Sequence, residues 1–500
     1  MSSILNRTAV SAGWVIGWRM ATRVLGLGST LVLVRVLLPG DFGLVALGSA
    51  FATTVDAMSS LGTDDALVRE RDADRAMYDT AFTLNAIRGL LTGLVLLSTA
   101  STVAVFFSEP RLTPLLMCFA ALAVIDGFVN TGIVDFRRNF QFHKEFILNI
   151  LPRLISVGVT IGTALAFHSF WALIAGQATF RILRVGASYR MHPYRPGVSL
   201  KAWRGLMIFS AWTWALSIVQ IVQMRVDAFV IGRTLDSSSV GAYALGAEVA
   251  TLPTSEIVDP LGRAAYSGFS ATRREGGTND LFYRLAASSL LITGPIGLGL
   301  SMVADPLVRI ALGEKWLQVV PIVQVLSLTC GIASFGNLAF MLLRSYGRLA
   351  ATFCVVLMGL AVKVTAIWFL LQLHGLTGAA EGAALAVTLE SVASFTIVAV
   401  TQRLSMRQLL ARCWRILVAC AAMVAMMSVA GLAWTGVADT FTGLATRLAG
   451  SVMLGATAYA ATGWVLWIVQ GRPEGAEADM LGTLAGVLRR MRSWARRPVP

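Results

Sequence analysis

Arginine residues lie inside several long apolar segments of this 500-residue chain. Arg19 and Arg23 are four residues apart in the first segment, so on a helix their side chains project from one face. Arg88 lies in the third segment and Arg225 in the seventh. A guanidinium group binds phosphate oxygens through paired hydrogen bonds. These four arginines are therefore candidates for binding an anion.

Polar residues accompany Arg225 in the seventh segment. Gln220, Gln223 and Asp227 follow one another at spacings of three and four residues, which places them along one face of a helix. A charge at the centre of a bilayer costs about 2.5 to 3.5 kcal/mol, so such residues usually face a cavity or a partner. We predict that these residues and the four arginines bind substrate in a cationic, hydrated cleft between two helix bundles.

The same arginines could instead be neutralised by carboxylates inside the apolar segments. Such carboxylates occur at Asp56, Asp126, Asp227, Glu256, Asp259 and Glu390. Two cations on one helical face are difficult to pair completely, which favours the functional interpretation for Arg19 and Arg23. Arg88 and Arg153 could extend to the membrane surface. Lys363 and Glu390 could form a structural pair or a proton-coupling site.

The elements that must position these residues are transmembrane helices. The chain is 56% hydrophobic and 14% charged, with a mean hydropathy of +0.71, which leaves too little charge to cover a soluble fold of this length. A span needs roughly 20 mostly apolar residues. About fourteen such segments follow one another, so we predict an all-α, polytopic membrane protein. They lie near residues 14–34, 42–60, 81–106, 114–135, 146–167, 169–189, 205–231, 240–259, 284–303, 317–341, 349–371, 376–400, 413–433 and 448–470.

The net charge of +14 is distributed unevenly between the two sides of this predicted bundle. Most Lys and Arg residues fall in alternate connections and in the C-terminal tail. The other connections carry only Arg35, Arg111, Arg233, Arg309, Lys315 and Arg447. Positively charged connections stay in the cytoplasm, so we predict a bacterial inner-membrane protein with both termini cytoplasmic. This distribution explains the basic charge without nucleic acid as a partner.

A repeat relates the first and seventh segments. The stretch from Arg35 to Gly48 aligns without a gap with the stretch from Arg233 to Gly246. Identical pairs are Arg35/Arg233, Leu37/Leu235, Gly43/Gly241, Ala46/Ala244, Leu47/Leu245 and Gly48/Gly246, with Trp14/Trp212 and Val32/Val230 at the same offset. Six segments separate the copies, so both halves run in the same direction, as in transporters with parallel repeats. Chance matching among Ala, Gly and Leu is the alternative.

The repeat divides the chain into two pseudo-repeated six-helix lobes followed by two C-terminal helices. We predict an N-terminal lobe at 1–190, a basic cytoplasmic linker at 191–204, a second lobe at 205–402, two additional helices at 403–470 and a basic tail at 471–500. The longest basic connection, Arg181 to Arg204, is interpreted as a hinge between the lobes. In the tail, Leu481, Leu484 and Leu488 share one helical face, typical of a helix on an anionic membrane surface. A frayed basic tail is the alternative.

Residue patterns for catalysis, metals and cofactors are missing from the sequence. No glycine-rich phosphate loop ending in Lys-Ser or Lys-Thr is present. The four histidines lie far apart, and the five cysteines have no paired metal spacing. Asp72-Ala73-Asp74 resembles the metal and nucleotide clamp of glycosyltransferases, but three residues match often by chance. We therefore predict no catalytic residue, no metal, no cofactor and no enzymatic activity.

The segment from Trp14 to Arg71 resembles the opening of a known family. The run Arg35-Val-Leu-Leu-Pro-Gly-Asp-Phe-Gly-Leu-Val-Ala46 is similar to that of the polysaccharide transporter family, the lipopolysaccharide O-unit flippase branch of the multidrug/oligosaccharidyl-lipid/polysaccharide exporter superfamily. The resemblance covers the whole chain in topology and is sharpest between Trp14 and Arg71. Gly40 and the pair Asp64-Asp65 depart from the family pattern, which leaves the subfamily and the sugar open.

The resemblance implies two six-helix lobes plus two further helices, alternating access, and a substrate built on undecaprenyl pyrophosphate. In this family, arginines on the first helix line a cationic central cavity, and Arg19 and Arg23 occupy the corresponding region here. We predict translocation of a lipid-linked oligosaccharide across the inner membrane for polysaccharide biosynthesis and export. Membrane lipids, a polysaccharide polymerase and glycosyltransferases are the further predicted partners.

Three other functions remain open at this point. A multidrug/cation antiporter of the same superfamily would favour acidic residues in its cavity. A polymerase or ligase would need a large periplasmic loop with catalytic polar residues, whereas the non-cytoplasmic connections predicted here are short. A non-transporting scaffold of a polysaccharide synthase complex would hold its partners through the basic tail.

Overall fold

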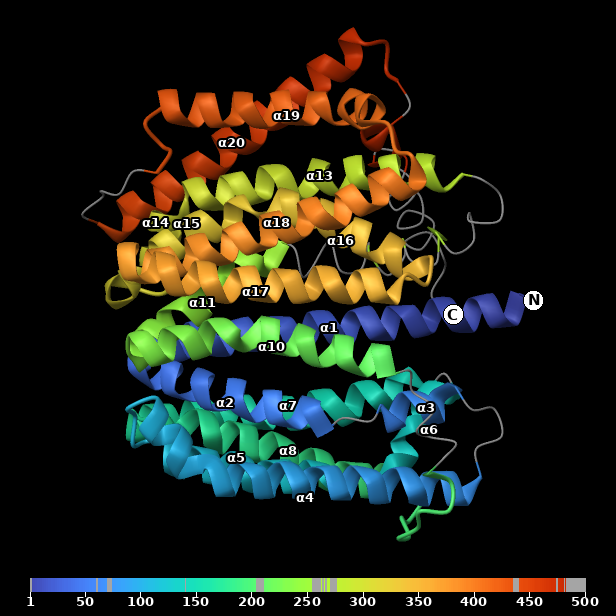
Figure 1. Cartoon of the computed structure of the whole chain (residues 1–500). Coiled ribbons are helices and arrows are strands. Elements are labelled where there is room, and N and C mark those ends of the chain that lie inside the picture. Colours follow the sequence, from blue (N-terminus) through green and yellow to red (C-terminus); the bar gives the residue numbers. More distant parts are fainter. Residues whose placement is uncertain are drawn as a thin grey trace, which may run out of the picture. The chain divides into compact units, whose positions relative to one another are not determined.

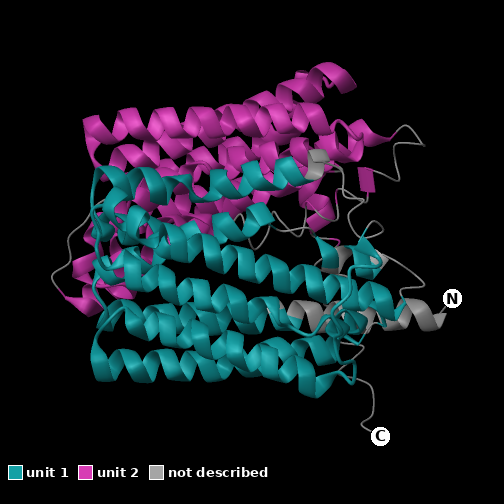
Figure 2. Ribbon diagram, turned by 60° about the horizontal axis from the view of Figure 1, so that its bottom comes forward, with its two compact units in different colours: residues 1–244 teal, residues 245–500 magenta. Residues whose placement is uncertain are grey.

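The computed structural model of the chain is built from helices (Figure 1). It describes residues 2–59, 62–69, 74–139, 141–203, 211–253, 277–434, 440–473 and 475–480, and the single residues 262, 265, 268, 269 and 482. No strand occurs in these ranges. The chain divides into two compact units, residues 1–244 and 245–500 (Figure 2).

The helices of unit 1 carry the residues that the sequence analysis selected. They are α1 (Ser2–Val36), α2 (Pro39–Ser59), α3 (Thr63–Arg69), α4 (Arg75–Phe106), α5 (Leu112–Gly127), η1 (Thr131–Ile133), α6 (Val134–Arg138), α7 (Phe142–Phe167), α8 (Trp171–Met191), α10 (Ala211–Thr234) and the start of α11 (Ser237–Pro253). Helix α1 packs against α7, α2 against α10 and α4, α4 against α5, and α7 against α8.

Unit 2 continues α11 and contains the remaining helices. They are α13 (Thr278–Met302), α14 (Ala304–Ala311), η3 (Glu314–Val319), α15 (Val320–Leu328), α16 (Cys330–Ser345), α17 (Leu349–His374), α18 (Leu376–Gln402), α19 (Met406–Val429) and α20 (Phe441–Val469). The prediction of two six-helix lobes joined at 191–204 stays a prediction.

The helices agree in position with the predicted membrane segments. Where its residues are described, each segment lies mainly on a helix or on one of two bent pairs, Leu112–Gly127 with Thr131–Arg138 (65°) and Glu314–Leu328 with Cys330–Ser345 (48°). Among the described residues, nine helices are long and apolar enough to cross a membrane, or eleven if each bent pair forms one span. The all-α, multi-pass character is therefore confirmed, and the predicted total number of spans stays a prediction.

Helix α8 corrects one sequence assignment. Arg181 and Arg184 fall both in the predicted segment 169–189 and in the predicted basic connection from Arg181 to Arg204, and α8 continues to Met191, which agrees with the segment. Arg181, Arg184 and Arg190 are therefore residues of a helix. These arginines also lower the mean hydropathy of α8. For this reason α8 is not among the described helices that are apolar enough to cross a membrane.

Several helix ends follow from the local sequence. The Asp74 carboxylate accepts a hydrogen bond from the Met77 N–H at 2.9 Å and so caps α4. The Asp72-Ala73-Asp74 motif thus ends in a helix cap. Ser405 caps α19 in the same way, and Thr440 caps α20. Gly375 joins α17 to α18 with φ of 60°, a left-handed backbone that glycine adopts without a steric cost.

The two copies of the sequence repeat have the same helix boundaries. Helix α1 ends at Val36 and α2 begins at Pro39. At the aligned positions, α10 ends at Thr234 and α11 begins at Ser237. The two-residue break between the helices is thus repeated as well as the sequence around it.

Two aligned glycines form a reciprocal contact between α2 and α11. A Cβ atom on Gly43 would lie 1.5 Å from the carbonyl oxygen of Ser237, and one on Gly241 would lie 2.1 Å from that of Pro39. Gly43 aligns with Gly241, and Pro39 aligns with Ser237. The contact is therefore symmetric, and the backbones approach too closely for any residue other than glycine at either position.

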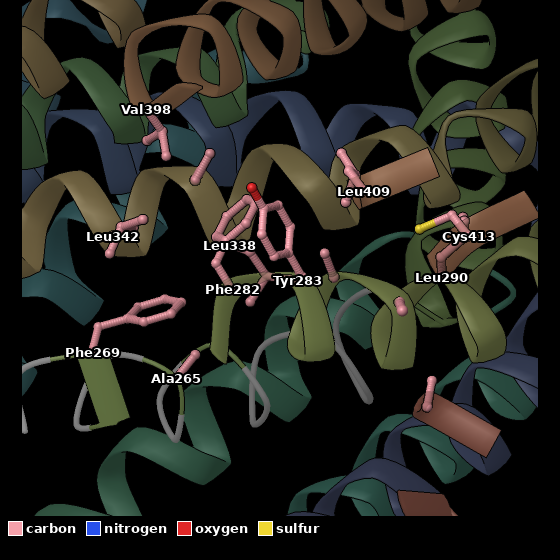
Figure 3. Packing of buried hydrophobic residues seen from close by; sticks show 14 of the residues in the cluster. Ala265, Phe269, Phe282, Tyr283, Leu290, Leu338, Leu342, Val398, Leu409 and Cys413 are labelled. Carbon is pink, nitrogen blue, oxygen red and sulfur yellow. The ribbon is translucent and has the colours of Figure 1, made fainter. Parts of the chain in front are cut away.

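The core of unit 2 surrounds Phe282 and Tyr283 on α13 (Figure 3). Their rings pack with Leu338 and Leu342 of α16, which are 0% and 1% exposed. The Tyr283 hydroxyl accepts a hydrogen bond from the Ser405 N–H at 2.7 Å, which fixes the start of α19 against α13. Arg412 places its guanidinium carbon 5.5 Å from the centre of the Tyr283 ring.

The chain after α20 folds back onto this core. Ala476 is 3% exposed and belongs to the same apolar cluster. Arg415 of α19 donates hydrogen bonds to both carboxylate oxygens of Glu477, at 2.8 and 2.9 Å, and a third to the side-chain oxygen of Gln470. Arg415 is only 5% exposed. We call residues 475–480 and the arginines that hold them the clasp.

A second pair attaches the clasp to α13. Arg284 donates to Asp479 at 2.6 and 3.1 Å, with side chains that are 49% and 38% exposed. Glu477 and Met480 of the clasp line one part of an apolar cavity of about 360 Å³ between α13, α19 and α20. The predicted membrane-surface positions Leu481, Leu484 and Leu488 lie outside the described residues.

The predicted linker is attached to unit 1 over its described part. The Gly197 N–H donates to the Asp79 carboxylate at 2.7 Å, and the Ser199 N–H donates to the Thr83 hydroxyl at 2.9 Å. The Tyr194 hydroxyl also donates to Asp79, and burial together with this bond raises the pKa of Tyr194. This part of the linker is therefore held against α4, and the hinge function stays a prediction.

Candidate functional site

Arg19 and Arg23 both lie on α1, as predicted. Arg23 is half-buried, whereas the side chain of Arg19 lies outside the described part of the structure. The neighbouring helix α7 adds a third arginine. The Nη2 atom of Arg153 lies 3.8 Å from the position that a Cβ atom would take on Gly26, less than one helical turn beyond Arg23. Arginines from two helices thus lie at the α1–α7 contact.

Arg88 of α4 faces Asp56 of α2. The Nε atom of Arg88 lies 3.6 Å from Oδ1 of Asp56, and the side chains are 26% and 45% exposed. This ion pair agrees with the alternative interpretation of the sequence, in which a carboxylate inside the apolar segments neutralises Arg88. The distance exceeds that of a hydrogen bond, and within the described residues no acceptor satisfies the enclosed Nε of Arg88. The ion pair is therefore loose.

Two further arginines meet a carboxylate beside this pair. Arg181 of α8 donates from Nη1 to Oδ2 of Asp126, at the end of α5, at 2.5 Å. Asp126 also interacts electrostatically with Arg184, Asp56 and Arg88. The five residues Asp56, Arg88, Asp126, Arg181 and Arg184 thus form one group, which we call the charge cluster of unit 1.

Arg184 is the least compensated member of the charge cluster. It lies three residues after Arg181, on the same side of α8. Within the described ranges, no carboxylate lies at ion-pair distance from Arg184, and its enclosed Nε has no hydrogen-bond acceptor. Arg184 and Arg181 were not among the predicted site residues, because they were also counted in the basic connection from Arg181 to Arg204. Their helical spacing, the same signal that selected Arg19 and Arg23, could have identified them.

The remaining predicted residues lie together on α10. This set comprises Gln220, Gln223, Arg225 and Asp227. The carboxylate of Asp227 is hydrogen-bonded to Tyr243 of α11, which is 4% exposed. Arg225 is half-buried, and no described carboxylate forms an ion pair with it. Because α10 packs on α2, these residues share a neighbour with the charge cluster.

The predicted residues thus occupy three places in unit 1. Arg23 lies at the α1–α7 contact, Arg88 in the charge cluster, and the polar set on α10. The predicted cleft that would join them stays a prediction. In the described ranges, no three His, Cys, Asp or Glu side chains are arranged to hold a metal ion. Guanidinium groups with few carboxylates can bind an anion, but they supply no nucleophile.

The fold and these internal charges define a class of protein. Long apolar helices, arranged in two compact units and carrying arginines within their length, are typical of a multi-pass membrane transporter. A family model described as polysaccharide biosynthesis protein matches residues 32–321. The chain belongs to this family, which confirms the resemblance noted between Trp14 and Arg71.

Similar proteins narrow the class further. The lipopolysaccharide biosynthesis protein WzxC of Escherichia coli K12 is 24% identical over 79% of this chain and 81% of its own length. The succinoglycan biosynthesis transport protein ExoT of Rhizobium meliloti is 23% identical over 71% of this chain and 72% of its own. The lipid II flippase MurJ, in an inward closed conformation, superposes with a TM-score of 0.73 at 13% identity, over 91% of this chain and 100% of that one. The chain thus has the fold of a known flippase, and its relatives are named as biosynthesis and transport proteins.

Proposed function

We propose that the chain flips an undecaprenyl-pyrophosphate-linked oligosaccharide across the bacterial inner membrane, with both termini in the cytoplasm. Family membership and the fold shared with a lipid II flippase support flipping of a lipid-linked sugar. In this proposal, glycosyltransferases supply the substrate on the cytoplasmic side, and a polymerase consumes it on the other.

One observation carries the choice of a diphosphate substrate. The charge cluster of unit 1 holds three arginines, Arg88, Arg181 and Arg184, with two described carboxylates, Asp56 and Asp126, and the helices α1 and α7 add Arg23 and Arg153. Moving an ionised phosphate from water into an apolar environment without a compensating group has a prohibitive cost in free energy. Guanidinium groups replace the lost hydration with charge-assisted hydrogen bonds.

The proposed mechanism is alternating access. The diphosphate and the sugar enter a cytoplasm-facing cavity lined by Arg19, Arg23, Arg88 and Arg225, with Gln220, Gln223 and Asp227 contacting the head group. The polyprenyl chain stays in the lipid, because its burial in an aqueous cavity would expose a large apolar surface. A change in the arrangement of the helix bundles then opens the cavity to the other side. The surplus of cations argues against a cation antiporter.

Replacement of both α1 arginines tests this proposal. The double variant Arg19→Ala/Arg23→Ala should abolish surface polysaccharide in cells that depend on this chain for export, while its amount in the membrane stays normal. The matched control Arg190→Ala/Arg348→Ala removes two exposed cations and should leave export unchanged. Normal polysaccharide in the first double variant would refute the role of these arginines.

A further inference from the structure

The charge cluster of unit 1 contains two arginines of α8, Arg181 and Arg184, to which the proposed function assigns no role. We infer that Arg184, assisted by Arg181 and Arg88, binds phosphate oxygens on this side of the protein. Asp126 and Asp56 hold the two assisting arginines in place. The inference rests on the proposed function and extends it, because it adds Arg184 and Arg181 of α8 to Arg88 among the residues that contact the diphosphate.

The charges of the cluster do not balance. Its five members are the cations Arg88, Arg181 and Arg184 and the anions Asp56 and Asp126. Asp126 is engaged by Arg181 at 2.5 Å and Asp56 by Arg88 at 3.6 Å, so both described carboxylates already have a cation within ion-pair distance. Arg184 remains as the surplus positive charge. A cluster with a surplus cation attracts an anion and repels a cation such as Na⁺.

The hydrogen bonds of the cluster are also incomplete. The Nε atoms of Arg184 and of Arg88 are both enclosed, and neither has an acceptor among the described residues. Enclosed N–H groups in proteins nearly always have an acceptor, so an enclosed and unsatisfied one requires an explanation. A phosphate bound against these side chains would offer acceptors to their guanidinium groups, and the planar guanidinium fork matches phosphate in this respect.

The spacing of the arginines on α8 is a third argument for an anion at the charge cluster. Arg181 and Arg184 are three residues apart, so their like charges face the same side of the helix and repel each other. Asp126 offsets this repulsion only in part, because its short contact is with Arg181 alone. A bound phosphate oxygen between the two guanidinium groups would offset the rest. Asp56 is half-exposed, so the charge cluster reaches the surface of unit 1.

Binding to the purified full-length chain in nanodiscs of uncharged lipid tests the inference. The probes are undecaprenyl diphosphate, undecaprenol as the ligand without a charged head group, inorganic diphosphate as a competitor and phosphatidylglycerol as a lipid phosphate. Arg184→Gln should weaken binding of undecaprenyl diphosphate by roughly ten- to a hundredfold, the effect of one charge-assisted hydrogen bond, and should leave undecaprenol binding unchanged. The matched variant Arg190→Gln, on an exposed site of the same helix, should bind within about twofold of the wild type.

Each other outcome overturns the inference in a distinguishable way. If Arg184→Gln binds the diphosphate as tightly as the wild type while Arg23→Gln does not, the cluster is structural and the proposed function stands. If the wild type binds undecaprenol as tightly as undecaprenyl diphosphate, both proposals are refuted. If phosphatidylglycerol displaces undecaprenyl diphosphate at equal concentration, the cluster is a site for lipid head groups. Arg184→Lys, which keeps the charge without the fork, serves if Arg184→Gln does not fold, and it should also weaken binding.

Discussion

The charge cluster of unit 1 and the clasp of unit 2 both pair arginines with carboxylates but differ in charge balance and in burial. In the clasp, Arg415 is 5% exposed and makes three hydrogen bonds to Glu477 and Gln470. In the charge cluster, Asp56 is 45% exposed, and the enclosed Nε of Arg184 has no acceptor among the described residues. The clasp is complete without a ligand, and the charge cluster is not.

This difference separates structural from binding arginines in a membrane protein. A buried pair whose hydrogen bonds are all made keeps the fold in one arrangement, and removal of one partner leaves an uncompensated charge. A partly exposed group with a surplus cation retains the capacity to bind an anion. An intramembrane arginine is therefore assigned by its partners, and its depth alone does not decide its role.

Removal of the buried guanidinium should have the largest effect on stability. Arg415→Met leaves Glu477 buried and without its partner, so we expect the free energy of unfolding to fall by about 3 to 5 kcal/mol. The apparent unfolding temperature of the purified chain in detergent measures this effect. The double variant Arg415→Met/Glu477→Leu removes both charges and should recover most of the loss. Equal loss in both variants would contradict the argument.

The helix positions could be predicted from the sequence because hydropathy and length follow directly from composition. The repeat was also visible, and the aligned boundaries Val36 and Thr234 show that its copies share helix ends. The packing reason for Gly43 and Gly241 could not be predicted, since it depends on a contact between the two copies.

The site was predicted less completely than the helices. Arg88 could be identified from the sequence as a candidate. Its pairing with Asp56 could not, because the two residues lie on different helices that meet only in the fold. Arg181 and Arg184 lay in the predicted segment 169–189 but were counted as part of a basic connection because further basic residues follow them, whereas α8 continues to Met191 and packs against α7 and α5. The clasp could not be predicted either, because Glu477 lies in a segment whose composition is that of a polar tail.

The outer pair of the clasp should contribute much less than the inner one. Arg284→Ala removes the bidentate contact with Asp479, whose side chains are 49% and 38% exposed. An exposed pair contributes about 0 to 1 kcal/mol, because both charges are well hydrated when apart. The same thermal unfolding measurement should therefore show a small decrease that salt diminishes. A loss as large as that of Arg415→Met would mean that exposure does not distinguish the two pairs.

Removal of the surplus cation should have the smallest effect on stability, although it should have a large effect on binding. Arg184→Gln removes the repulsion from Arg181, about 0.2 to 0.5 kcal/mol, together with the longer-range attraction to Asp126, and breaks no described ion pair. Its apparent unfolding temperature should equal or slightly exceed that of the wild type. Arg181→Gln is the matched change, because it removes the 2.5 Å bond to Asp126 and should destabilise the chain. If Arg184→Gln were the more destabilising of the two, Arg184 would be held by the fold, and the distinction between the charge cluster and the clasp would disappear.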